Sequence, residues 1–238
     1  MEVQFNTQAQ EDFMMARLLL SVLLLAGTNS FANQPELDDL MTPDELAAEI
    51  GITEPTDLSP QVEPFTPAQI YDTYGVDIYS EFPVVIVVSK GSQTATVYHN
   101  GSQVNHFLIS TGREKYERAK SGRWYFTTTP TGWFSPQSYI LKYWSGTWDA
   151  LMEYAIFFNG GVALHATTPD HYKDLGHRAS GGCVRMHKTN AIWFWNLSQS
   201  ERGTNVPYFT RGGQILRNKD GSIKRHNGNG TLIIVTSY

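Results

Sequence analysis

The chain has 238 residues, a formal net charge of −5 and a single cysteine, Cys183, so a disulfide bond within the chain is excluded. This length fits one domain of ordinary size plus an extension. No nucleic-acid-binding motif is recognisable, and the export signal described next directs the chain away from nucleic acid.

An export signal is predicted near the N-terminus. Arg17 supplies a basic start, residues 18–26 form an apolar run, and small residues precede a cleavage site near Ala32. The run is far shorter than the ~20 residues needed to span a bilayer, although an uncleaved anchor remains an alternative. We expect a secreted, periplasmic or cell-wall-associated protein. Met14 or Met15 is a more natural start than the first residue, because the segment before them precedes any usual signal.

Charge divides the rest of the chain into two parts. Residues 33–82 contain twelve acidic residues and no Lys or Arg, whereas residues 83–238 contain eight acidic and seventeen basic residues. One hypothesis is that this acidic lead folds against the basic body and partly covers its cleft; the alternative, which we slightly prefer from the sequence, is a plain spacer. We therefore predict an N-terminal extension with signal peptide over 1–32, an acidic, partly helical lead over 33–82, and the main domain over 83–238.

Two short helices are predicted in the lead. Thr42-Pro43 offers a capping residue followed by a proline suited to the first helical position, and Gly51 is placed to end that helix. Thr66-Pro67 repeats the pattern, with Gly75 as the stop.

Strands dominate the main domain. The β-branched run Val84–Val88 is typical of a buried strand, and Asn100-Gly101 between two apolar runs indicates a hairpin. One helix is predicted over Asn190–Leu197, capped by Thr189. This pattern favours a mainly β domain with few helices. The further predicted strands are Thr94–His99, Gln103–Ser110, Trp124–Thr128, Ser138–Tyr143, Tyr154–Phe158, Val162–Ala166, Gln214–Arg217 and Leu232–Thr236.

Residues suited to nucleophilic catalysis occur close together in the sequence. Cys183 follows two glycines, Gly181 and Gly182, and His165 ends a predicted strand. A neighbouring imidazole would take the thiol proton and stabilise the thiolate, which is the nucleophilic form. Glycine-flanked amides can converge on a developing oxyanion, and the planar fork of Arg185 suits a carboxylate. Taken singly, each residue also has a structural interpretation, such as a buried small hydrophobe or a turn.

The combination resembles the L,D-transpeptidase catalytic domain, a YkuD-like domain. The family motif is a histidine on a strand, then a loop, then Ser-His-Gly-Cys-hydrophobic-Arg-(Leu or Met). Three flanking segments, at 86–101, 109–112 and 129–134, also resemble the family, so the likeness covers about residues 83–218. The matching motif residues are His165, Ser180, Gly182, Cys183, Arg185 and Met186.

The resemblance implies a β-sandwich or barrel-like domain with one main helix after the motif, and a cysteine acyltransferase that needs no metal or organic cofactor. Such enzymes attack a peptidoglycan tetrapeptide after its third residue and release D-alanine. The thioester passes to an amine of another stem, which gives a 3→3 cross-link. The expected partners are a tetrapeptide donor and a stem-peptide or amine acceptor, and the expected state is a monomer.

The resemblance also assigns roles to the site. Cys183 would be the nucleophile and His165 the base, while Ser180, Gly181 and Gly182 would belong to the oxyanion and orienting group. Arg185 would hold the motif loop, which we favour, or bind a stem carboxylate.

Two positions depart from the family. Gly181 stands where the family usually has His, and Ala166 where it often has Gly or Ser. We expect Gly181 to alter rate or specificity, and we expect a backbone carbonyl to orient the imidazole in place of a hydroxyl.

Three other functions remain open. The same fold could serve hydrolysis, as an L,D-carboxypeptidase or an amidase that releases a linked protein. A non-catalytic wall-binding module is opposed by the presence of both His165 and Cys183. A papain-like protease is opposed by chain order, because that family places its cysteine near the mature start and its histidine far downstream.

Overall fold

The computed structural model describes residues 35–59 and 61–238, which belong to one compact unit. The predicted signal peptide lies outside the described residues. Within the described ranges, none of the helices has the length and apolar character required to cross a membrane.

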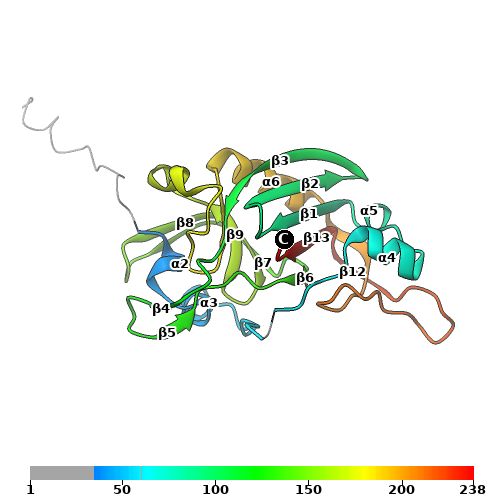
Figure 1. The fold of residues 1–238 in the computed structure, drawn as a ribbon, viewed down its shortest axis with the longest axis horizontal. Helices are drawn as coiled ribbons and strands as arrows, with labels where there is room; N and C mark the ends of the chain where they lie inside the picture. Colours follow the sequence, from blue (N-terminus) through cyan, green and yellow to red (C-terminus); the bar gives the residue numbers. More distant parts are fainter. Residues whose placement is uncertain (1–34, 60) are drawn as a thin grey trace, which may run out of the picture. The chain divides into compact units, whose positions relative to one another are not determined.

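Strands are the main regular structure of the described chain, as Figure 1 shows. The strands are β1 Val84–Ser89, β2 Thr94–His99, β3 Ser102–Ser110, β4 Tyr116–Arg118, β5 Trp124–Phe126, β6 Gly132–Phe134, β7 Ser138–Ser145, β8 Ala150–Asn159, β9 Val162–Ala166, β10 Val184–Met186, β11 Arg202–Pro207, β12 Arg225–Asn229 and β13 Thr231–Thr236. Among these residues, nine strands form one sheet in the order β6-β13-β1-β2-β3-β10-β9-β8-β7, and β4-β5 and β11-β12 form separate ribbons. The mainly β architecture predicted from the sequence is confirmed.

The helices are short, apart from one. They are α2 Leu37–Leu40, α3 Pro43–Glu49, α4 Pro67–Tyr74, α5 Ile78–Glu81, α6 Lys188–Ser200 and the 3₁₀ turn η1 Pro169–Asp174. The two helices predicted in the lead are confirmed as α3 and α4. Thr42 and Thr66 each accept a hydrogen bond from the amide three residues later, as an N-cap should.

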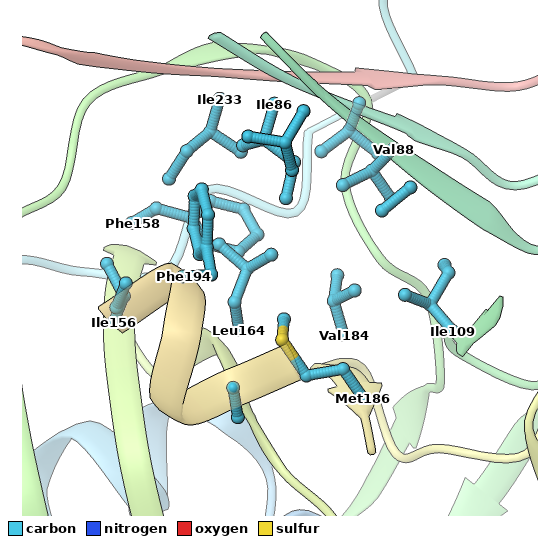
Figure 2. Packing of buried hydrophobic residues seen from close by; sticks show 14 of the residues in the cluster. Ile86, Val88, Ile109, Ile156, Phe158, Leu164, Val184, Met186, Phe194 and Ile233 are labelled. Atoms are coloured by element: carbon cyan, nitrogen blue, oxygen red, sulfur yellow. The ribbon is translucent and has the colours of Figure 1, made fainter. Parts of the chain in front are cut away.

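The main hydrophobic core lies on one face of the sheet, against α6. Because strand side chains alternate between faces, Ile86 and Val88 point into this core while Val85 points away from it. The same rule sends Leu164 and Val184 into the core, as Figure 2 shows. It therefore places the intervening residues of β9, including His165, on the opposite face.

The acidic lead covers this opposite face. Helix α4 and α5 pack over β1 and β13 in one hydrophobic cluster, and α2 and α3 pack over β8 in another that includes Cys183. The hypothesis that the lead folds against the body is therefore confirmed, and the plain spacer that we preferred from the sequence is wrong. Ion pairs accompany it, including Asp39 with Arg113 at 2.6 Å and Glu45 with Arg123 at 3.1 Å.

Two sequence predictions were wrong in detail. Gln214–Arg217 is not a strand, because Ile215 and Arg217 make only isolated bridges to Phe209 and Ile223. The main helix α6 begins at Lys188, before the predicted start at Asn190. Its N-cap is His187 and not Thr189, and the His187 side chain accepts a hydrogen bond from the Thr189 amide.

Candidate active site

Two adjacent strands carry the predicted site residues on one face of the sheet. His165 lies on β9 and Arg185 on β10, and the parallel register of the two strands sets these residues side by side. Cys183 directly precedes β10. Because residues two apart on a strand share a face, Cys183, Arg185 and His165 all face the lead.

The imidazole of His165 is oriented to act as a base. Its Nδ1 lies 2.9 Å from the carbonyl oxygen of Ala166, which can only accept, so Nδ1 carries the proton. The neutral ring then keeps its free lone pair on Nε2, and a ring nitrogen of His165 lies within 4.8 Å of the Cys183 Sγ. Nε2 has no hydrogen-bond partner among the described residues. The backbone carbonyl thus does the orienting that the sequence led us to expect.

The thiol of Cys183 is buried, and backbone groups are its hydrogen-bond partners. Its Sγ points toward the Gly161 carbonyl oxygen at 3.7 Å and accepts from the Ala163 amide at 3.4 Å. Burial raises the pKa of the Cys183 thiol well above its usual value, and the nearby carboxylate of Asp38 raises it further. In this arrangement Cys183 is a thiol and not a thiolate.

The motif loop is fixed by its own hydrogen bonds. The hydroxyl of Ser180 donates to the Cys183 carbonyl at 2.6 Å and accepts from the Gly182 amide at 3.1 Å. The Gly181 amide donates instead to Asp38 Oδ2, at 3.2 Å. Gly182 has a φ of 155°, which favours glycine. Ser180 therefore orients the loop, and the Gly181 amide faces an anionic oxygen.

Replacing Ser180 with alanine should destabilise the fold by about 1–3 kcal/mol, because it leaves a buried amide and a buried carbonyl without their partner. Urea-induced unfolding measures this loss. Ser200→Ala is the matched control, since Ser200 is exposed and its hydroxyl bonds only a carbonyl three residues earlier. Equal stability of the two variants would contradict the orienting role.

Among the described residues, Arg185 binds carboxylates of the lead and makes no hydrogen bond to the motif loop. Its Nη2 lies 2.7 Å from Asp38 Oδ1 and 2.8 Å from Asp39 Oδ2. Arg185 and Asp38 are both buried, with side-chain exposures of 1% and 3%. Burial alone would raise the pKa of Asp38, but the charge and hydrogen bonds of Arg185, together with the charge of Arg113, outweigh burial and hold that pKa below its usual value.

This pKa shift predicts how docking of the lead depends on pH. A carboxyl whose pKa is lowered by folding stabilises the folded state above its unfolded pKa, and the contribution is lost as pH falls through the folded value. Docking of α2 and α3 should therefore be unchanged from about pH 8 to about pH 5, and should weaken only below about pH 3.8. Hydrogen exchange of the amides in α2 and α3 measures it. Weakening near pH 6 would contradict the prediction.

A second carboxylate of the lead is bound next to the site. Glu36 is buried and its Oε1 accepts from the Thr167 hydroxyl at 2.6 Å and the Thr168 amide at 2.8 Å. The lead also fills the region above the thiol so closely that no water-sized space remains there. That region is lined by Asp38, Met41, Pro43, Leu46, Gly161, Gly181, Gly182 and Cys183.

Asp38, His165 and Cys183 also form a group whose ligand atoms lie within 4.8 Å of one another, close enough for a metal ion to be considered. The Arg185 guanidinium opposes a cation there, because it already occupies the nearest oxygen of Asp38. The donor set thus fits an ion pair better than a metal centre.

Sequence reasoning missed Asp38 and Glu36, which contact the site most closely from outside the motif. Their only signal was membership of the acidic lead, since the contact between Asp38 and Arg185 spans 147 residues. The structure brings together Cys183, His165 and Arg185 as expected. A depression of about 420 Å³ is lined by Asp39, Arg113, Tyr116, Glu117, Arg118, Ala119, Trp124 and Tyr125.

Comparison with protein families gives a match to the L,D-transpeptidase catalytic domain (YkuD) over residues 83–232. No significant match to a curated protein was found.

Solved structures with similar folds include L,D-transpeptidases of two mycobacteria and of Xylanimonas cellulosilytica. The Mycobacterium smegmatis enzyme is 18% identical, with a TM-score of 0.44, over 66% of this chain and 59% of that one. The Mycobacterium tuberculosis H37Rv enzyme is 19% identical, with a TM-score of 0.43, over 66% and 58%. The Xylanimonas enzyme is 21% identical, with a TM-score of 0.40, over 66% and 61%. The matched region thus spans less than two thirds of each of these chains.

Proposed function

Because the chain belongs to the family of L,D-transpeptidase catalytic domains, we propose that it transfers acyl groups between peptidoglycan stem peptides through a thioester on Cys183. The observation that carries this proposal is the placement of Cys183 Sγ within 4.8 Å of a ring nitrogen of His165, whose Nε2 is unpartnered among the described residues, on one face of the sheet. No other cysteine exists in the chain to supply a thiolate.

The first half of the reaction forms the thioester. His165 Nε2 takes the thiol proton, and the thiolate attacks the carbonyl carbon of the third residue of the stem. The carbon–nitrogen bond to D-alanine then breaks, and the proton returns from His165 to the leaving amine. The second half reverses these steps, with the side-chain amine of another stem attacking the thioester and Cys183 recovering its proton.

Charge stabilisation would come from the motif loop. The Gly181 amide already donates to a carboxylate oxygen of Asp38, so it is available to an oxyanion once that carboxylate is absent. The Gly182 amide is engaged by Ser180, which supports an orienting role. Arg185 pairs with carboxylates in the structure, which favours recognition of a stem carboxylate over the loop-holding role expected from the sequence.

A product assay tests the proposed function. The purified protein is incubated with a disaccharide tetrapeptide, and products are identified by mass spectrometry. A cross-linked dimer with loss of D-alanine supports transpeptidation, a tripeptide monomer indicates hydrolysis, and an unchanged substrate with retained wall binding indicates a binding module. Cys183→Ala is the control, since it keeps the fold but has no thiol.

We further propose that the chain acts outside the cytoplasm after cleavage near Ala32. The wall substrate and the predicted signal support this location. The intact mass of the protein recovered from the cell envelope tests it, because cleavage removes a segment of known sequence.

A further inference from the structure

We infer that residues 36–46 of the lead keep the enzyme latent by occupying the acyl-donor site above Cys183, and that they must leave before a stem peptide can react. The inference rests on the proposed function and concerns regulation of the same site. Three independent features of the docked segment support it.

The first feature is apolar packing over the nucleophile. Leu37, Leu40, Met41 and Leu46 of the lead form one hydrophobic cluster with Cys183, and Leu37 and Leu40 are each at most 1% exposed. No water-sized space remains above the thiol. A peptide carbonyl cannot approach Sγ while this packing persists.

The second feature is charge. The lead seats the Asp38 carboxylate between the Arg185 guanidinium and the Gly181 amide. It also places Glu36 against the Thr167 hydroxyl and the Thr168 amide. Arg185 and the Gly181 amide are the groups that the proposed function uses for a substrate carboxylate and an oxyanion. Docked lead and bound substrate therefore exclude each other.

The third feature is a pair of glycines that make room for the backbone of the lead. A Cβ added at Gly161 would lie 1.7 Å from the Pro43 carbonyl oxygen, and one added at Gly181 would lie 1.6 Å from the Asp38 carbonyl oxygen. Neither glycine has a positive φ, so their own backbone conformation accepts a side chain. Close approach of the lead excludes a side chain at Gly161, and at Gly181 the lead makes the tightest contact, with the Tyr125 hydroxyl at 2.7 Å as a second. Gly181 is also where the resembling family usually has His, which accounts for that departure.

Opening also changes the chemistry of the thiol. With the lead displaced, Cys183 loses both the apolar cover and the Asp38 carboxylate, the two causes that raise its pKa most. Displacement thus both exposes Sγ and makes its proton easier to remove.

Single methyl groups added to the body test the inference without altering the lead. Gly161→Ala and Gly181→Ala should eject the lead, whereas Gly146→Ala is a matched control with nothing within 4 Å of the added Cβ. The readout is the rate of iodoacetamide alkylation at neutral pH, which reports Cys183 alone because the chain has no other cysteine. We expect at least a tenfold increase for both variants and no change for the control. Alkylation of wild-type protein as fast as that of both variants would overturn the inference.

Further measurements exclude the possibility that faster alkylation results from loss of the folded core. Cooperative thermal unfolding and near-UV circular dichroism must show that each variant keeps its folded core. Asp38→Asn supplies a second route, since it keeps the shape of the lead but removes the charge that Arg185 holds, and it should also speed alkylation.

The product assay separates latency from function. If the variants are alkylated fast but form no wall product, the proposed function is wrong and the latency inference is unaffected. Wild-type protein that forms product as fast as the Gly161→Ala and Gly181→Ala variants would overturn latency and leave the function standing.

Discussion

Replacing Cys183 with alanine should lower product formation by roughly 10⁶-fold, which is the scale seen when a catalytic nucleophile is removed. The thiol is the only one in the chain, so no neighbouring cysteine can replace it. Stability should change by no more than about 1 kcal/mol, because the side chain loses only one small atom and weak hydrogen bonds. Mass spectrometry of muropeptide products measures the first effect and urea unfolding the second.

The comparison is sharpest in an opened protein. Cys183→Ala should be combined with Gly161→Ala, so that a low starting rate caused by the docked lead does not hide the loss. Cys183→Ser serves as the conservative control, because it keeps the shape of the side chain and replaces the sulfur with a far weaker nucleophile at neutral pH. Retention of product formation within tenfold in the alanine variant would rule out the thioester mechanism.

Replacing Arg185 with methionine should cost about 3–5 kcal/mol of unfolding free energy, because it leaves the buried Asp38 carboxylate without its counter-charge. Methionine keeps the length and apolar stem of the side chain. The guanidinium is 1% exposed and bonds Asp38 through both Nε and Nη2, at 3.2 and 2.7 Å. Denaturant unfolding followed by tryptophan fluorescence measures this loss of unfolding free energy.

A double-mutant cycle checks the cause. If the unpaired charge is responsible, adding Asp38→Asn to Arg185→Met should restore more than half of the lost stability, because no buried charge is then left alone. Glu54→Gln is a matched control for loss of a lead carboxylate, since Glu54 is exposed. Purely additive losses in the double variant would show that the two side chains do not act as a pair.

The fold was predictable where local pattern and tertiary pairing agree. The β-branched runs of β1 and β13, the Asn-Gly turn after β2, and the capped starts of α3 and α4 all carry strong local signals. The strand predicted over Gln214–Arg217 is absent because alternation of apolar and polar residues does not by itself make a strand. Its residues find only isolated bridge partners, at Phe209 and Ile223.

The site residues of the main domain were predictable from the sequence, but those that the lead contributes were not. Cys183, His165 and Arg185 were identified from their types, spacing and resemblance, and the register of β9 with β10 explains why they meet. Asp38 could not be singled out, because twelve acidic residues share the lead and nothing local distinguishes one of them. The departure at Gly181 was visible in the sequence, but its physical reason lies in a carbonyl oxygen of Asp38 that only the folded chain brings near.

The filled space above Cys183 has a kinetic consequence for any covalent drug. Such a molecule can react only after residues 36–46 have opened, just as a buried amide exchanges with deuterium only after local opening. At low dose the labelling rate rises with concentration, and at high dose it levels off at the opening frequency of the protein itself. A bulky carbapenem and a small alkylating reagent would then reach the same maximum labelling rate, because that rate is set by the opening of residues 36–46 and not by the compound.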